Sequence, residues 1–330
     1  MNDPRRSPVR RLALLLLAAL VSAHFALTLA RAAHPFLDVA AYAGFTAPRP
    51  FQYRLLMAPV LGGLTDLLRG PGLAPLLRDL PGWIAPADSL ALAAINALAF
   101  LAALLVLWPL ALRVHAGSRP LAAASTALFV ALSYLFFCLN PNLSFALPYD
   151  VPALAFTLLA LLLHRKGWWP ALVLVFALGT LNRETILFVP VAIAVGALLP
   201  GGRRRDLAGA AGLVAVWIAI KAALAAHFVH LRSEEGLRLA YNLAELARPW
   251  QWPAIFILPL LFGLAAREAL RRPPTLDLLL TALAGGALLF ALGQITETRA
   301  FGELIPYLAL GLAPMVQRWL APLPSTPQPR

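Results

Sequence analysis

The side chains that could carry chemistry in this chain are ionisable and tyrosine residues set between long apolar runs. A carboxylate can serve as a general base, and an arginine can bind oxyanions while keeping its charge. Ionisable groups are costly at a membrane edge, where they tend to face a cavity or a partner. The candidate site residues are Asp38, Tyr42, Tyr53, Arg54, Tyr149, Asp150, Asn182, Arg183, Glu184, Glu297, Arg299 and Glu303. Together they indicate a polar site close to lipid headgroups.

Each of these groups also has a purely structural alternative. Arg54 could extend its charge to the membrane surface while its stem lies on apolar residues. Asp150 precedes a Val-Pro pair and could cap the helix that starts there. The Arg183-Glu184 pair could form a polar turn between two helices, and Asp38 and Tyr42, four residues apart, could form a surface pair.

Composition places the chain in a membrane. Soluble domains carry about 25% charged residues, whereas this chain of 330 residues carries 13%, with 61% hydrophobic residues. The formal net charge of +12 does not predict a nucleic-acid partner, because the excess Lys and Arg flank apolar runs as they do in cytoplasmic loops. Cys138 is the only cysteine, which excludes an intramolecular disulfide and a multi-cysteine metal site. We assign no metal ligands.

Apolar runs of helical length predict an all-α polytopic membrane protein with a single transmembrane domain over residues 1–330. The first run could be a cleaved signal peptide, but it is long enough to span and many runs follow, so we expect a retained helix. About ten transmembrane helices are expected. They cover residues 12–30, 90–112, 121–139, 151–164, 168–199 interrupted at 182–184, 207–226, 253–266, 275–293 and 304–320.

Basic clusters assign the sides of the membrane. With both termini cytoplasmic, RVHAGSR, HRKGWW, GGRRRD and REALRRPP all fall inside, as the positive-inside rule requires. This holds if residues 55–68 do not span, and they are short for a span. Residues 31–89 are then one long first extracytoplasmic loop with amphipathic helices at the membrane surface. Residues 227–252 form a second large extracytoplasmic loop, and the candidate residues collect on this same side.

This arrangement resembles the GT-C class of integral membrane glycosyltransferases, in an uncharacterised bacterial branch. The resemblance is carried by FLDVAAY, PFQYRLLMAP, YDVP, LNRETILFVP and ETRAFGELIP, in this order along most of the chain. Two features depart from the family pattern. Many members have two adjacent acidic residues in the first loop, whereas Val39 follows Asp38 here, and this chain has no large soluble C-terminal domain.

The resemblance implies a transferase in a bacterial inner membrane that moves a sugar from a polyprenyl-phosphate carrier to an acceptor on the extracytoplasmic side. Asp38 would be the general base, and some members also use a divalent cation. Arg54 would hold the carrier phosphate, with Arg183 or Arg299 as a second clamp. The remaining candidates would hold these arginines or bind the sugar, and they are Tyr42, Tyr53, Tyr149, Asp150, Asn182, Glu184, Glu297 and Glu303. Membrane lipids and the lipid-linked sugar are the expected partners, with an acceptor that the sequence leaves open.

Two other functions remain open from the sequence. A transporter or flippase of a lipid-linked substrate would also gather charges around a cavity, and the break at residues 182–184 resembles the interrupted helices of transporters. A non-catalytic subunit with the GT-C fold would account for the missing second acidic residue.

Overall fold

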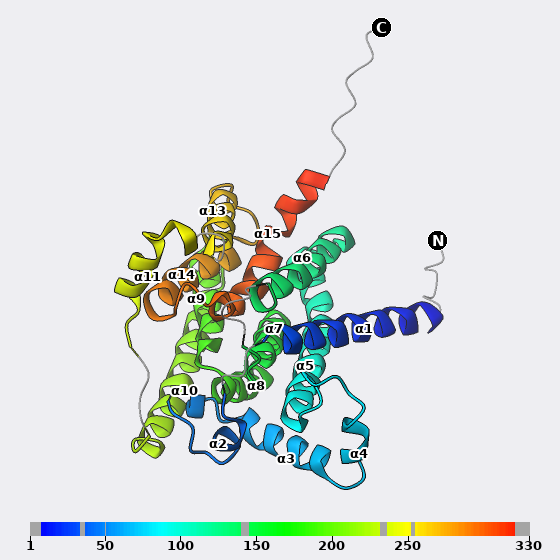
Figure 1. Cartoon of the computed structure of the whole chain (residues 1–330). Coiled ribbons are helices and arrows are strands. Elements are labelled where there is room, and N and C mark those ends of the chain that lie inside the picture. Colours follow the sequence, from blue (N-terminus) through cyan, green and yellow to red (C-terminus); the bar gives the residue numbers. More distant parts are fainter. Residues whose placement is uncertain are drawn as a thin grey trace.

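The long apolar runs fold as helices. The computed structural model describes residues 8–33, 37–49, 51–139, 145–231, 236–251 and 255–320, and every regular element in these ranges is helical (Figure 1). The larger helices are α1 (Pro8–Ala32), α5 (Ala87–Val114), α6 (Arg119–Phe137), α7 (Asp150–Lys166), α8 (Trp169–Asn182), α9 (Phe188–Leu198), α10 (Arg205–His227), α13 (Ile257–Ala269), α14 (Leu276–Leu292) and α15 (Ile305–Leu320). Short helices connect them: α2 (Val39–Ala43), η1 (Phe51–Tyr53), α3 (Met57–Arg69), α4 (Ala74–Leu77), η2 (Glu184–Leu187), α11 (Leu239–Leu246), η3 (Pro249–Gln251) and η4 (Thr298–Leu304).

Five segments of the described residues are long and apolar enough to cross a membrane. They are Arg11–Ala32, Ala87–Val114, Arg119–Phe137, Arg205–His227 and Thr298–Leu320. The predicted helical membrane fold is confirmed at this level, while the full set of ten crossings stays a prediction. Parts of the predicted loops and both chain ends, including residues 1–7, 140–144, 232–235 and 321–330, lie outside the described residues.

The segment expected to lie at the membrane surface contains a short amphipathic helix. Helix α3 has 13 residues and buries Ala58, Leu61 and Thr65. These positions recur three to four residues apart, so they form one face of the helix. That face packs toward α2 and α5. A helix of this length is too short to span a bilayer, which needs about 20 residues.

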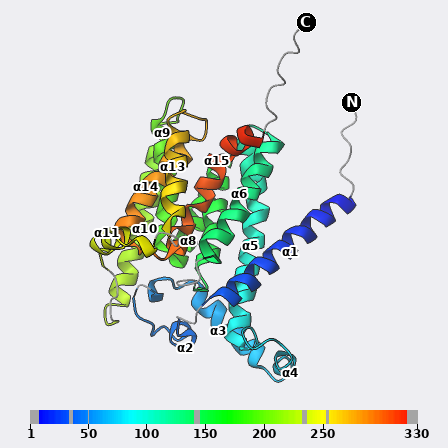
Figure 2. The ribbon, with the colours of Figure 1, turned by 45° about the horizontal axis from the view of Figure 1, so that its top comes forward.

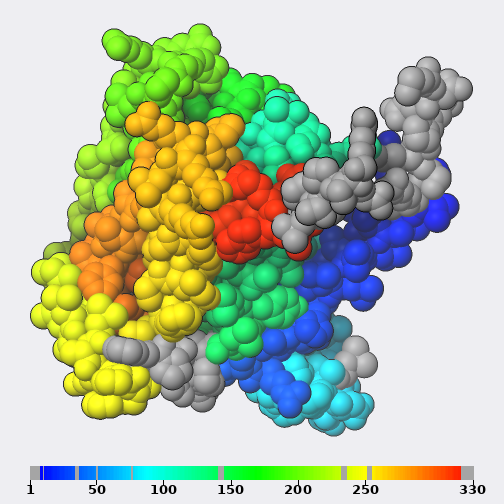
Figure 3. Space-filling view, turned by 90° about the horizontal axis from the view of Figure 1, so that it is seen from above, coloured from blue at the N-terminus to red at the C-terminus, as the bar shows by residue number. Residues whose placement is uncertain are grey.

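Helices α7 and α15 form the centre of the bundle. All residues from Ile305 to Ala313 of α15 are buried, and a helix that is apolar all round belongs in an interior. Helix α15 packs against α6, α13 and α14, whereas α7 packs against α5, α8 and α9. Figure 3 shows α13 in gold beside α14 and α15 at one end of the molecule.

Helix α1 lies at the edge of the bundle and contacts α5 along one side (Figures 1 and 2). The contact includes stacked rings of Phe25 and Phe100, with centroids 4.2 Å apart. The rest of its surface exposes large apolar side chains, including Leu12, Leu16 and Leu20. An apolar surface of this extent is unfavourable in water but suits contact with lipid. The structure therefore belongs to a helical membrane protein.

Close packing of α14 and α15 depends on Gly311. A Cβ atom at this position would lie 2.5 Å from Leu279 Cδ2 and 2.9 Å from its Cγ. We expect Gly311→Ala to destabilise the fold by about 1–3 kcal/mol through overpacking, measured as a lower thermal midpoint in detergent. Gly212→Ala on α10 is the control, since a Cβ there meets nothing within 4 Å. Equal midpoints for the two variants would contradict this packing.

Candidate functional site

The apolar stretch after Trp168 is interrupted where the sequence predicts it. Helix α8 ends at Asn182, and Arg183 is extended, with φ −161° and ψ 136°. The 3-10 helix η2 then begins at Glu184. Extended backbone at one residue turns the chain, so the polar side chains at the break leave the axis of α8 and reach neighbouring segments.

Two other segments are joined to this break by hydrogen bonds. Leu56 N–H donates to the Leu181 carbonyl at 3.1 Å, which attaches the first predicted loop. Asn182 Nδ2 donates to the Tyr149 carbonyl at 2.9 Å, which attaches the residues just before α7. Three parts of the chain that are distant in sequence therefore meet at the end of α8.

Asp150 is the centre of a buried ion-pair cluster. It is 1% exposed, and its two carboxylate oxygens bind different arginines. Arg183 Nη1 donates to Oδ1, and Arg299 Nη1 donates to Oδ2 at 2.9 Å. Arg299 Nη2 also donates to Glu297 at 2.8 Å, and Arg183 Nε forms an ion pair with Glu303. The carboxylate of Asp150 thus joins two other segments as well as beginning α7.

Arg54 points into the protein rather than out to the membrane surface. It is 8% exposed, and its Nη2 donates to Glu184 Oε1 at 2.7 Å. The ring of Tyr149 lies under the guanidinium, 4.5 Å from its Cζ. Burial opposes the charge, but the neighbouring Glu184 carboxylate outweighs burial and raises the pKa of Arg54 well above its ordinary value. The alternative in which Arg54 extends its charge to the surface is therefore wrong for this structure.

Helix α2 joins Asp38 to this cluster. The Asp38 carboxylate is exposed and accepts a hydrogen bond from Ala41 N–H at 2.9 Å, which caps the helix. Tyr42, one turn later, is fully buried and donates its hydroxyl hydrogen to the Arg54 carbonyl. Burial raises the pKa of the Tyr42 hydroxyl well above its usual value, so it stays a donor. Helix α2 therefore presents Asp38 outward while its other side is fixed to Arg54.

Tyr53 lies apart from the cluster. Its hydroxyl accepts a hydrogen bond from Arg49 Nη1 at 3.1 Å, and its ring faces the Lys221 ammonium at 4.4 Å. It packs with Leu224 and Phe228 at the end of α10. Of the three tyrosines expected to bind a sugar, Tyr42 and Tyr149 are together, with ring centroids 6.0 Å apart, and Tyr53 faces a different surface.

Other residues at the site were not identified from the sequence. Trp217 Nε1 donates to the Glu184 carbonyl at 2.8 Å and fixes the break from α10. Thr298 Oγ1 donates to the Phe136 carbonyl at 3.0 Å and holds the start of η4 on α6. Tyr307 is fully buried, one helical turn after Glu303. Trp217 could have been noticed in the sequence, because it lies in the middle of an apolar run. Tryptophans of membrane proteins are more usual at the interfaces.

Several polar atoms in the cluster are buried without a hydrogen-bond partner among the described residues. They are Tyr149 Oη, Asn182 Oδ1, Glu303 Oε2 and Tyr307 Oη. An unsatisfied buried polar group costs about 1–3 kcal/mol, so this concentration is unusual for a purely structural core.

The charged cluster consists of arginine and carboxylate side chains. Within the part of the chain that the structure describes, no three His, Cys, Asp or Glu side chains are placed to hold a metal together. Three arginines, each paired with at least one carboxylate, form the ion pairs of the cluster. Guanidinium forks bind phosphate and carboxylate in the same bidentate manner.

Comparison with family models, with curated proteins and with solved structures gives no match for this chain.

Proposed function

We propose that this protein is a GT-C-like membrane glycosyltransferase. It would transfer a sugar from a polyprenyl-phosphate carrier to an acceptor on the extracytoplasmic side of a bacterial inner membrane, with both termini in the cytoplasm. The observation that carries the proposal is the link through α2. This helix holds an exposed carboxylate at Asp38 and, one turn away, a Tyr42 hydroxyl bonded to the Arg54 carbonyl.

In this proposal Arg54 binds the carrier phosphate by exchange. Its fork is occupied by Glu184, with Nη2 2.7 Å from Oε1 and Nε 3.4 Å from Oε2. A phosphate offers the same two-oxygen geometry with more negative charge, so it competes for the fork. The displaced Glu184 side chain is 27% exposed and has access to water. The developing charge on the leaving phosphate is then stabilised by a cation already held in place.

The other charged side chains of the cluster hold its arginines in position. Asp150 positions Arg183 and Arg299 relative to each other. Arg183 or Arg299 is then available as the second cation near the phosphate. Tyr149 contributes a ring face beneath Arg54.

Arg54→Lys tests the phosphate role. We expect carrier binding to weaken about tenfold or more, because lysine keeps the charge but lacks the bidentate fork. The measurement is the affinity of the purified protein in nanodiscs for a short polyprenyl-phosphate sugar. Arg49→Lys is the control, since Arg49 bonds Tyr53 outside the cluster and should change affinity less than twofold. Equal affinity for Arg54→Lys and wild type would contradict the role of Arg54.

A transporter or flippase of a lipid-linked substrate is the second candidate. The interrupted helix at Arg183 favours it, because transporters build binding sites from such breaks. An assay in proteoliposomes distinguishes the two functions. A transferase forms a glycosylated product without moving the carrier, whereas a flippase moves the labelled carrier between leaflets without forming product. Carrier binding with neither outcome would favour the non-catalytic subunit.

A further inference from the structure

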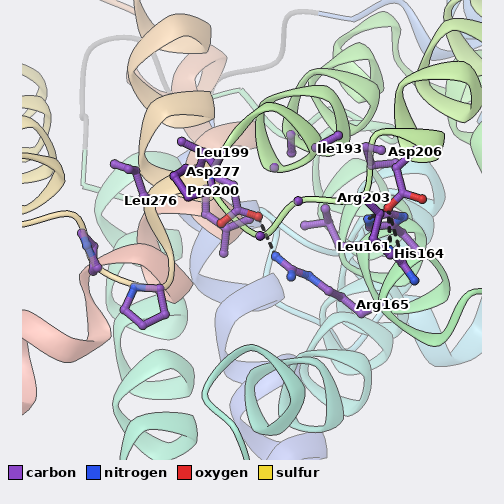
Figure 4. A pocket seen from close by; sticks show the side chains of 18 of the residues that line it. Leu161, His164, Arg165, Ile193, Leu199, Pro200, Arg203, Asp206, Leu276 and Asp277 are labelled. Atoms are coloured by element: carbon purple, nitrogen blue, oxygen red, sulfur yellow. Dashed lines mark hydrogen bonds and ion pairs between the residues drawn. The ribbon is translucent and has the colours of Figure 1, made fainter.

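A cavity of about 680 Å³ lies away from the charged cluster described above. It is lined by the end of α7, by α9, by the loop from α9 to α10 and by the loop before α14 (Figure 4). Leu161, Ile193 and Leu278 give it apolar walls. Its charged and ionisable side chains are His164, Arg165, Arg203, Asp206, Arg272 and Asp277.

The cavity and the charged cluster lie at opposite ends of the same helices. Asp150 begins α7, and Arg165 is near its end, so about 22 Å of helix separates them at 1.5 Å per residue. Helix α9 likewise follows the break at Arg183 and ends at the cavity. In Figure 2 the loops beyond α9 and α13 are at the top, and α2 and α3 are at the bottom. The positive-inside rule assigns the cavity to the cytoplasmic face.

The cavity carries an excess of positive charge. Arg165 pairs with Asp277 at 2.6 Å and Arg203 with Asp206 at 3.0 Å. Arg272 forms no ion pair with any residue that the structure describes. Three arginines and two aspartates give the lining a formal charge of +1, and the exposed Arg203 and Arg272 are open to an anion that enters the cavity.

Arg272 is held at the cavity by an uncommon backbone conformation. Its φ is +50°, in the left-handed region that normally favours glycine. For other residues this conformation costs about 1–2 kcal/mol. An arginine kept here despite that cost, with Pro273 and Pro274 after it, is consistent with a function for its side chain. The loop after α9 folds back onto the end of that helix, since a Cβ on Gly202 would lie 2.2 Å from the Gly196 carbonyl oxygen.

A second observation points to hydrogen-bond donors on the ligand. Asp277 is 8% exposed, and while its Oδ2 binds Arg165, its Oδ1 is buried with no partner among the described residues. His164 Nδ1 is likewise buried with no hydrogen-bond partner among the described residues. A buried carboxylate oxygen needs a donor. A ligand that satisfies both the arginines and this oxygen would combine an anionic group with a donor such as a hydroxyl.

We propose that this cavity binds a hydroxyl-bearing phosphate ester of the glycerophosphate type, with the phosphate at Arg272 and Arg203 and a hydroxyl at Asp277 Oδ1. Basic pockets between transmembrane helices on the cytoplasmic side bind anionic headgroups in this way. The same chemistry is available from a phosphatidylglycerol headgroup or from a soluble glycerol phosphate. This site is independent of the glycosyltransferase proposal.

The test uses the full chain in phosphatidylcholine nanodiscs. One arm titrates glycerol 3-phosphate by calorimetry, and the other counts bound short-chain phosphatidylglycerol by native mass spectrometry. Binding in the lipid arm alone identifies a headgroup site, and binding in the first arm identifies a site that accepts the soluble ester. Failure of wild-type protein to bind in either arm would overturn the proposal.

Arg272→Gly is the decisive variant, because glycine suits φ +50° and the fold is expected to keep or raise its thermal midpoint. We expect its affinity to fall tenfold or more. Arg271→Ala is the matched control. Arg271 is the neighbouring charge, it pairs with Glu268 at 3.6 Å and it does not line the cavity, so affinity should stay within twofold. Equal losses in both variants, or none in Arg272→Gly, would exclude this cavity as the site.

Discussion

Asp150→Ala is expected to leave little folded protein in the membrane. Its carboxylate neutralises Arg183 and Arg299, which are 4% and 6% exposed. Alanine would leave both guanidinium groups buried with one partner each, Glu303 and Glu297. Removing one partner of a buried ion pair typically costs about 3–5 kcal/mol. That is a large part of the 5–15 kcal/mol by which proteins are stable.

The measurement is the yield of monodisperse protein after detergent extraction, followed by its thermal midpoint. Glu245→Ala is the matched control. Glu245 is equally buried, at 3% exposed, but its ion pair is with Arg248, whose side chain is 49% exposed and lies on the next turn. Its loss leaves a cation in water, so yield should remain close to wild type.

Asp150→Asn separates charge from shape. Asparagine keeps the size of the side chain and one acceptor oxygen, so its yield should lie between those of Asp150→Ala and Glu245→Ala. A wild-type midpoint for both Asp150 variants would show that the charged cluster does not hold α7 to the segments that contain Arg183 and Arg299.

The helices were predictable from the sequence because apolar runs have helical length. The run expected at 90–112 is α5, and the run expected at 207–226 is α10. The break at 182–184 was also predictable, because polar residues interrupt an apolar run there. Three polar residues cannot continue an apolar helix through lipid at low cost, and α8 ends at Asn182.

The convergence of the site was predictable, but its pairings were not. Sidedness alone placed Arg54, Asp150 and Arg183 at one face. It did not say that Asp150 binds two arginines or that Arg54 binds Glu184, because those contacts depend on helix rotation and on the extended backbone at Arg183. Tyr53 illustrates the limit: it adjoins Arg54 in sequence, yet its ring faces Lys221.

The cavity at the other end was missed because its arginines fit a simpler explanation. Arg165, Arg203 and Arg272 lie in basic segments that the positive-inside rule already accounts for. Two aspartates beside these basic segments were the available sequence signal for the cavity. Asp206 and Asp277 each lie in the first turn of a helix beside one of these segments and are buried rather than solvated.

Asp38→Asn is expected to abolish sugar transfer while leaving carrier binding intact. A general base contributes about 10²- to 10⁴-fold to rate, and an amide cannot accept the acceptor proton. Asparagine caps helices as well as aspartate, so the bond from Ala41 N–H to residue 38 is retained. Helix α2 and the Tyr42 bond to Arg54 then stay in place, and the loss reports chemistry rather than folding.

The experiment measures transfer and carrier binding on the same preparation in nanodiscs. Asp66→Asn is the control, because Asp66 is also an exposed carboxylate of the first predicted loop and lies on α3. It should keep wild-type transfer. Full transfer by Asp38→Asn would remove Asp38 as the base. Loss of carrier binding in Asp38→Asn would instead assign Asp38 to holding α2, because the proposed function gives carrier binding to Arg54 and the chemical step to the Asp38 carboxylate.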